Sequence, residues 1–173
     1  MGELTFVLGG TRSGKSRFAR ERATVLGGDR VTFVATARPG DPELDARIAA
    51  HRRDRPPAWR TVEVETDLEA SVATAPAEDV LLLDSLTLWV SWCLDRGADA
   101  RAGWAPVGRT IAERRTPTIV VSDEVGLGIV PPSPLARRFV DDLGALHQRV
   151  AHQATTVVLL VAGVPIFLKG SSS

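Results

Sequence analysis

The chain of 173 residues carries 44% apolar and 24% charged side chains, which is the balance of a globular protein with its own core rather than of a disordered segment. Lys and Arg together number 21, as do Asp and Glu, so a general electrostatic attraction to nucleic acid or to an anionic membrane is not expected. With one cysteine, Cys93, the chain cannot form an internal disulfide. A small-molecule partner is therefore the better expectation.

The apolar pattern alternates between short buried strands and amphipathic helices. In chain order it predicts a strand at 4–8, a helix at 14–26, a strand at 31–35, a helix at 42–53, a short extended piece at 59–65, a strand at 80–83, a helix at 85–94, a surface loop at 96–106, a strand at 118–121, a helix at 135–150, a strand at 156–161 and a short edge strand at 166–169. This alternation predicts an α/β fold with a mostly parallel central sheet and helices on both faces. We expect a single domain over 1–169 and a tail or linker over 170–173.

The pattern contains no membrane or secretory segment. The longest apolar stretch, 157–168, is interrupted by Gly163 and Pro165 and is too short to span a bilayer. The first residues run directly into the first predicted strand without a basic region and a cleavage site, so no signal peptide is expected. These features favour a cytoplasmic protein.

The segment from Gly9 to Ser16 reads Gly-Gly-Thr-Arg-Ser-Gly-Lys-Ser and matches the complete G-x-x-x-x-G-K-[ST] pattern between a strand and a helix. Its glycines let the backbone curl so that several N–H groups point at one anion, and the helix that follows adds the positive end of its dipole. We expect Lys15 to neutralise the β- and γ-phosphates and the Ser16 hydroxyl to ligate Mg²⁺. The pattern predicts a P-loop that binds a nucleoside triphosphate.

A second metal ligand is expected at the end of a neighbouring strand. Asp84 closes the apolar run 80–83 and is placed for that role. It could equally cap the helix predicted from Ser85 through its carboxylate. The sequence leaves both roles open.

The P-loop fixes a class of ligand and not a reaction. A GTP-dependent switch would show an Asn-Lys-x-Asp guanine motif, and the chain has none. A DNA-dependent ATPase would have a basic surface, which the neutral charge argues against. A small-molecule kinase fits the size, although the arginine-rich lid usual in such kinases is not evident.

Further motifs follow the P-loop. Residues 47–56 read RIAAHRRDRP, and WRTVE follows at 59–63; DSLTLWVS occupies 84–91 and DEVGLGIVP occupies 123–131. In this order the motifs resemble the bifunctional adenosylcobinamide kinase and adenosylcobinamide-phosphate guanylyltransferase family of cobalamin biosynthesis. The resemblance covers about 4–169, and its second and last motifs are far more specific than the P-loop.

The resemblance implies a RecA-like P-loop NTPase fold, a homotrimer and two reactions. In the first, ATP or GTP phosphorylates the hydroxyl of the aminopropanol arm of adenosylcobinamide. In the second, GTP guanylylates an enzyme histidine, and adenosylcobinamide phosphate then takes the GMP to give adenosylcobinamide-GDP. The implied partners are therefore a corrinoid, the two nucleotides and Mg²⁺.

The resemblance also implies site residues. It places the guanylylated histidine at His51, with Lys15 as the second catalytic residue, and it places Mg²⁺ at Ser16 and Asp84. The implied nucleotide contacts are Gly9, Gly10, Thr11, Arg12, Ser13, Gly14, Lys15, Ser16, Ala35, Thr36, Ala37, Arg52, Arg53, Asp54, Arg55, Glu63 and Asp84. Arginines beside a histidine can neutralise phosphate charge as it shifts, and Glu63 could accept hydrogen bonds from guanine or from ribose.

Helical spacing alone would make His51 a packed histidine, so its catalytic role comes from the resemblance. The two other histidines, His147 and His152, are expected at the surface of the last long helix. His147 and Val140 replace the Asn and Arg expected from the family pattern. Asp123 and Glu124 follow a strand, where they could contact substrate or metal, or simply serve a turn.

Two other functions fit the residues. One is a P-loop kinase of another small alcohol without nucleotidyl transfer, and the other is a nucleotide-binding regulatory protein without catalysis. A covalent GMP adduct distinguishes the family's activity from both.

Overall fold

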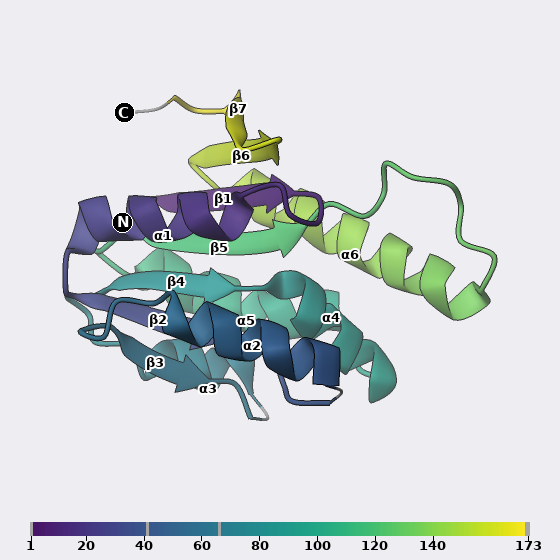
Figure 1. The fold of residues 1–173 in the computed structure, drawn as a ribbon, viewed down its shortest axis with the longest axis horizontal. Coiled ribbons are helices and arrows are strands. Elements are labelled where there is room, and N and C mark those ends of the chain that lie inside the picture. Colours follow the sequence, from purple (N-terminus) through teal and green to yellow (C-terminus); the bar gives the residue numbers. More distant parts are fainter. Residues whose placement is uncertain (1, 41, 66, 172–173) are drawn as a thin grey trace.

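The computed structural model describes residues 2–40, 42–65 and 67–171. Within them one sheet contains seven strands in the order β3-β2-β4-β5-β1-β6-β7 (Figure 1). The strands are β1 (Leu4–Gly9), β2 (Val31–Ala35), β3 (Arg60–Glu63), β4 (Val80–Asp84), β5 (Thr118–Asp123), β6 (Thr156–Val161) and β7 (Val164–Lys169). All neighbours pair in parallel except β6 and β7, which are antiparallel. The predicted mostly parallel α/β sheet is therefore confirmed.

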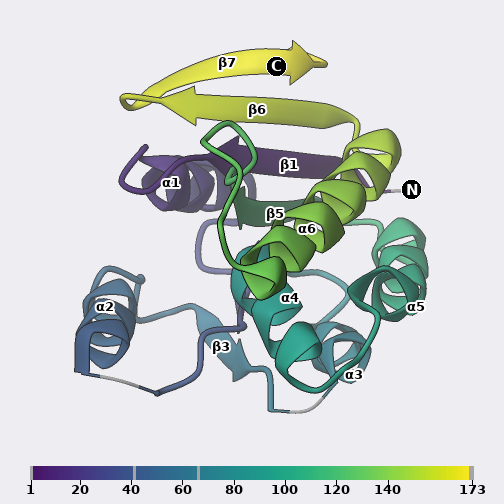
Figure 2. The same cartoon turned by 90° about the vertical axis from the view of Figure 1, so that its right-hand side faces the viewer.

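The helices cover both faces of this sheet. They are α1 (Lys15–Gly27), α2 (Pro42–Arg53), α3 (Leu68–Ala73), α4 (Leu86–Asp95), α5 (Ala100–Glu113) and α6 (Pro134–Gln153). Figure 2 shows α1 and α2 on one side and α3, α4, α5 and α6 on the other. Among the described residues no helix is long and apolar enough to cross a membrane.

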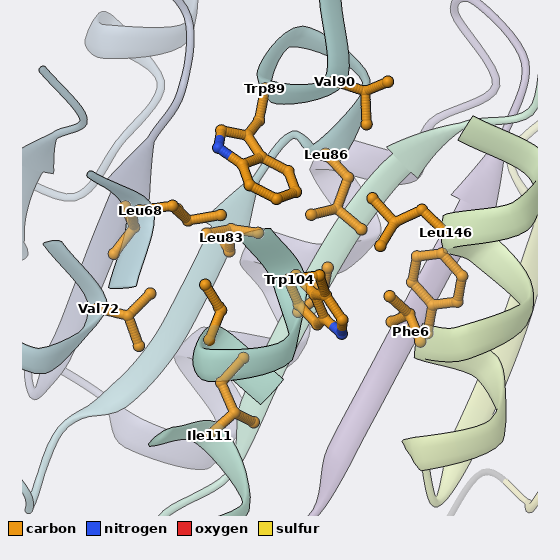
Figure 3. Close-up of a cluster of buried hydrophobic side chains, with 14 of the residues drawn as sticks. Phe6, Leu68, Val72, Leu83, Leu86, Trp89, Val90, Trp104, Ile111 and Leu146 are labelled. Carbon is orange, nitrogen blue, oxygen red and sulfur yellow. The ribbon is translucent and has the colours of Figure 1, made fainter. Parts of the chain in front are cut away.

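Two layers of buried side chains hold the helices to the sheet. On the side of α3 to α6, Phe6, Leu83 and Leu146 meet Trp104 in a cluster that is almost entirely shielded from water (Figure 3). On the other side, Ala19 and Ala23 of α1 pack against the sheet. Complete burial of a large apolar side chain stabilises a fold by about 1.5–3 kcal/mol, so these layers fix where the ends of the strands lie.

The register of the parallel strands gathers polar residues at one edge. Gly9 at the end of β1 pairs with Asp123 at the end of β5. Ala35 at the end of β2 pairs with both Asp84 of β4 and Glu63 of β3. Because carboxyl ends of parallel strands share an edge, the P-loop and three acidic residues from separate parts of the chain become neighbours.

The surface loop predicted at 96–106 is wrong, because α5 begins at Ala100. Asp99 caps this helix by accepting hydrogen bonds from the backbone N–H groups of Arg101 and Ala102. The buried face of α5 includes Trp104 and Ile111, which pack in the core. The Gly and Pro residues of this segment had weakened the helical pattern in the sequence.

Two smaller differences concern helices. The short helix α3 was not predicted, although Asp67 caps it and Leu68 and Val72 anchor it in the core. Leu135, expected on the buried face of the last helix, is 60% exposed at the first turn of α6.

The edge strand predicted at 166–169 is confirmed as the end of β7. Of the expected tail, residues 172–173 lie outside the described residues.

Candidate functional site

The P-loop joins β1 to α1 and depends on glycine at two positions. Gly14 has φ of +92°, and a Cβ there would lie 3.3 Å from the Cα of Gly163 in the β6–β7 turn. A Cβ on Gly9 would lie 2.9 Å from the carbonyl oxygen of Leu160. The N–H of Gly163 also donates to the carbonyl of Ser13 over 2.9 Å. The turn between β6 and β7 therefore contacts the P-loop directly, and glycine at positions 9 and 14 permits the backbone of β6 and of this turn to approach the loop so closely.

The Lys15 ammonium lies at the centre of the site. Its Nζ is 2.5 Å from Oδ1 of Asp123 and donates to the carbonyl of Gly10 over 3.2 Å. The Lys15 side chain is 12% exposed and that of Asp123 is 27% exposed. Asp123, whose role the sequence left open, therefore neutralises the P-loop lysine in this structure.

Asp84 lies beside Ser16. Burial raises the pKa of the Asp84 carboxyl, and the charge on His51, a hydrogen bond from Ser16 and the charge on Lys15 oppose that rise. The alternative role of Asp84 as a helix cap is wrong, because Ser85 occupies the N-cap of α4. The carboxylate is therefore directed to the same space as the Ser16 hydroxyl.

Two adjoining pockets open around these residues. The first contains an apolar wall and a charged rim, and its lining consists of Lys15, Ser16, Phe33, Ala35, Ala37, Ile48, His51, Arg52, Arg55, Glu63, Asp84, Ser85, Leu88 and Asp123. The second follows the P-loop and is lined by Arg12, Ser13, Gly14, Lys15, Ser16, Arg17, Arg20, His51, Asp54, Ala162 and Gly163. Lys15, Ser16 and His51 line both pockets. A single extended ligand could therefore contact all three.

His51 lies in the last turn of α2 and is exposed. Charged contacts connect the end of this helix to the rest of the site. Arg20 of α1 lies 3.4 Å from the Asp54 carboxylate, and Arg52 is paired with Glu63 of β3. These pairs bring the histidine and its neighbouring arginines to the P-loop side of the sheet.

Arg55 is held differently from the other arginines of its motif. Its guanidinium lies 3.8 Å from the centre of the Phe33 ring, in contact with the π face. Burial lowers the pKa of Arg55, while Asp84 and Glu63 act in the opposite direction. An arginine side chain thus forms one wall of the first pocket.

Some residues expected in the site lie outside both pockets. Thr11 and Arg53 are exposed and line neither. Thr36 is buried, where its hydroxyl donates to the carbonyl of Ser85 over 2.6 Å and accepts from the N–H of Ser85 over 2.9 Å. Thr36 therefore joins the end of β2 to the start of α4. Gly9 and Gly10 contribute to the bend of the loop without lining either pocket.

Sequence reasoning missed two parts of the site. Ala162 and Gly163 of the β6–β7 turn line the second pocket, and only the isolated glycine in the last apolar stretch signalled them. His147 is only 8% exposed, so its expected surface placement is wrong. It lies under the end of β5, and burial lowers its pKa against the opposing effect of Glu124 and Asp123.

Comparison with known proteins identifies the family. The family model described as "Cobinamide kinase / cobinamide phosphate guanyltransferase" matches residues 5–168. The protein CobP of Pseudomonas aeruginosa, described as a bifunctional adenosylcobalamin biosynthesis protein, is 43% identical over 95% of this chain and 96% of its own length. The protein CobU of Escherichia coli, with the same description, is 37% identical over 96% of this chain and 99% of its own length.

Solved structures support the fold. The flagellar accessory protein FlaH of Methanocaldococcus jannaschii matches with a TM-score of 0.56 at 15% identity, over 98% of this chain and 79% of that one. The ATPase domain of G40P matches with a TM-score of 0.55 at 13% identity, over 99% of this chain and 78% of that one. The P-loop NTPase fold is thereby confirmed. The family match and the two curated relatives together establish that this chain belongs to the cobinamide kinase / cobinamide phosphate guanyltransferase family.

Proposed function

We propose that the chain phosphorylates adenosylcobinamide with ATP or GTP, and then transfers GMP from GTP to adenosylcobinamide phosphate through a GMP–His51 intermediate. The observation that carries this proposal is that His51 lines both pockets together with Lys15 and Ser16. One triphosphate can then present its γ-phosphate to an acceptor alcohol or its α-phosphate to the imidazole. The second step would release adenosylcobinamide-GDP.

In the nucleotidyl half-reaction, an imidazole nitrogen of His51 attacks the α-phosphorus of GTP. The bond from this phosphorus to the bridging oxygen of the β-phosphate breaks, and pyrophosphate leaves with the electron pair. We expect Lys15 and the N–H groups at the start of α1 to neutralise the leaving group. Arg52 and Arg55 extend positive charge along the first pocket. The acceptor phosphate then attacks the same phosphorus and frees the histidine.

We propose that Ser16 and Asp84 hold the metal. A hydroxyl and a carboxylate suit Mg²⁺, which otherwise takes oxygen ligands from phosphates and water. Among the described residues no group of three or more His, Cys, Asp or Glu side chains could hold a metal ion. When bound by Ser16 and Asp84, Mg²⁺ would offset the negative charge of the triphosphate.

Asp84→Asn should raise the Mg²⁺ concentration needed for half-maximal kinase activity by about tenfold or more, because the amide lacks the carboxylate charge. Mg²⁺ titrations of the initial rate measure this shift. Asp95→Asn, at the exposed end of α4, is the matched control and should leave the titration unchanged. An unaltered Mg²⁺ requirement in Asp84→Asn would remove Asp84 from the metal site.

We propose that the first pocket takes the guanine base, with Glu63 at its edge. Phe33, Ile48 and Leu88 supply apolar surface, and the plane of the Arg55 guanidinium offers a stacking face. The Glu63 carboxylate can accept hydrogen bonds from a base that carries N–H donors on its edge. Its pairing with Arg52 keeps the carboxylate at the pocket.

Glu63→Gln should raise the GTP KM of the transferase reaction about tenfold and reduce discrimination against ATP, because the amide offers one oxygen acceptor in place of two. Steady-state assays with each nucleotide measure both effects. Glu65→Gln, two residues further along and exposed, is the matched control. Equal weakening of all nucleotides would instead assign Glu63 to the ribose or to holding Arg52.

We further propose that the protein works in the cytoplasm as a homotrimer. Besides the nucleotides, its proposed partner is the corrinoid substrate, and no nucleic-acid partner is proposed. Support for assembly comes from exposed apolar side chains, among them Leu127, Ile129 and Val130 in the loop that follows β5. This loop extends beyond the sheet in Figure 1. Sedimentation equilibrium of the purified chain tests the trimer directly, and a monomer at micromolar concentration would contradict it.

Mass spectrometry after incubation with GTP and Mg²⁺ tests the central proposal. A covalent adduct that adds the mass of GMP less one water is expected on the intact chain, and after GTP is removed it should disappear when adenosylcobinamide phosphate is added. A kinase of another alcohol, or a regulatory protein that only binds nucleotide, forms no such adduct. Absence of the adduct with a folded and nucleotide-bound protein would refute the intermediate.

A further inference from the structure

His147 is the buried end of a chain of hydrogen bonds that reaches the end of β5. Its Nε2 lies 2.8 Å from Oγ of Ser122 on β5. The Ser122 hydroxyl lies 3.1 Å from Oγ1 of Thr87 on α4, and Thr87 Oγ1 accepts a hydrogen bond of 2.7 Å from the N–H of Asp123. We call His147, Ser122 and Thr87 the buried hydroxyl chain. It connects α6 and α4 to the end of β5.

Only the first of these bonds has a fixed direction, because the Asp123 N–H can only donate and Thr87 Oγ1 accepts from it. In the arrangement that we infer, Thr87 donates its own proton to Ser122, and Ser122 donates to Nε2 of His147, whose ring proton is then on Nδ1. Nδ1 lies 3.8 Å from Oε2 of Glu124, so the imidazole N–H faces a carboxylate. In this arrangement both hydroxyls and Nε2 of His147 have hydrogen-bond partners.

The end of β5 is the part of the molecule that the chain holds in place. The Glu124 N–H donates to the carbonyl of Gly9 over 3.0 Å, and Asp123 is paired with Lys15. The position of Asp123 relative to the P-loop therefore depends on Thr87 on one side and on the β1–β5 register on the other. Ser122 is fully buried, so a hydrogen bond lost by its hydroxyl is not replaced by a bond to water, and the unpaired hydroxyl costs free energy.

We propose that His147 is a positioning residue for the phosphate site, acting through Ser122 and Thr87 to hold Asp123 where it orients the Lys15 ammonium. This inference rests on the proposed function, since it concerns the same lysine. An ammonium that is already oriented needs no rearrangement when charge develops on the phosphates. Loss of this orientation therefore lowers turnover more than nucleotide affinity. His147 itself touches no nucleotide pocket.

The test compares two replacements of His147. His147→Leu removes the acceptor at the position of Nε2, and kcat of both the kinase and the guanylylation reactions should fall about tenfold, with nucleotide KM changed by less than about twofold. His147→Gln can return an acceptor to that position and should restore most of the rate. If His147 only fills space, the order reverses: Leu is tolerated and Gln is harmful.

Ser122→Ala provides a smaller change that should survive folding if His147→Leu does not. It should reproduce the fall in kcat, and the double variant with His147→Leu should be no slower than either single variant. In an Asp123→Asn background, His147→Leu should have little further effect, because the group through which it acts has been altered. A full additional tenfold loss in that background would overturn the proposal.

Thermal unfolding of each variant separates folding from turnover, and His152→Leu, at the exposed end of α6, is the matched control. The kinase assay does not depend on the histidine adduct. If the wild-type chain formed no adduct, the proposed intermediate would fail while the kinase data still tested the buried hydroxyl chain. If kcat of the kinase stayed at the wild-type value in both His147→Leu and Ser122→Ala, the inference alone would be refuted.

Discussion

His51→Ala is expected to abolish the GMP adduct and the transferase reaction while the kinase rate stays within about threefold of wild type. The nucleotidyl path needs the imidazole as a nucleophile, whereas direct transfer of the γ-phosphoryl group to an alcohol does not. His51 is exposed at the end of α2, so its truncation removes little packing. Intact-mass measurement of the adduct and a parallel kinase assay give both readouts from one preparation.

Peptide mapping makes this prediction sharper, because the chain contains 3 histidines and the other two, His147 and His152, both lie on α6. A phosphoramidate is labile in acid and stable in alkali, so mapping at high pH should place the GMP on the peptide of His51. His152→Ala is the control and should keep the adduct and both activities. A label on another residue would end the assignment, and equal loss of kinase would mean that His51 shapes the common nucleotide site.

The strands and the P-loop could be predicted because their signals are local. An uninterrupted apolar run such as 80–83 can only be a fully buried strand or helix segment, and its length favours the strand. The pattern of the P-loop requires a strand before it and a helix after it, which β1 and α1 provide. The pairing of Ala35 with both Asp84 and Glu63 could not be predicted, since register between distant strands depends on the whole sheet.

The missed elements depended on tertiary contacts. The segment that forms α5 contains Gly103 and Pro106, which weaken a helix on their own. Its stability comes instead from the burial of Trp104 and from the cap at Asp99. His147 was misplaced for a related reason: helical spacing shows which residues share a face and not that Ser122 of another element offers a hydrogen bond there.

The candidate site was predicted unevenly. The sequence identified Lys15 and Ser16 through a spacing with a chemical reason, and the structure places Asp84 next to them. For His51, spacing alone pointed to a packed residue, and its exposed position on two pockets becomes visible only in three dimensions. The pairing of Lys15 with Asp123 had no local signal, because the two residues are more than a hundred positions apart.

Lys15→Ala should reduce both the kinase rate and the rate of guanylylation by about 10²–10³-fold. In the proposed mechanism both reactions draw on one triphosphate site, a proposal supported by the single P-loop among the described residues and by the place of Lys15 in the lining of both pockets. Each reaction accumulates charge on the β- and γ-phosphates, either as the γ-phosphoryl group departs or as pyrophosphate leaves. Removal of the ammonium therefore raises both barriers by a similar amount. Single-turnover assays of ADP formation and of adduct formation measure the two rates separately.

The fold should survive Lys15→Ala. Loss of the lysine side chain leaves the Asp123 carboxylate without its ion-pair partner, but the Asp123 side chain is 27% exposed and can be hydrated. The other lysine, Lys169, donates to the carbonyls of Ala151 and His152 at the end of α6 and lines neither pocket. Lys169→Ala should therefore cost a little thermal stability and no activity, the reverse of the expected result for Lys15→Ala. If Lys15→Ala retained one of the two activities near the wild-type rate, the two reactions would need separate nucleotide sites, and the single-site mechanism would be wrong.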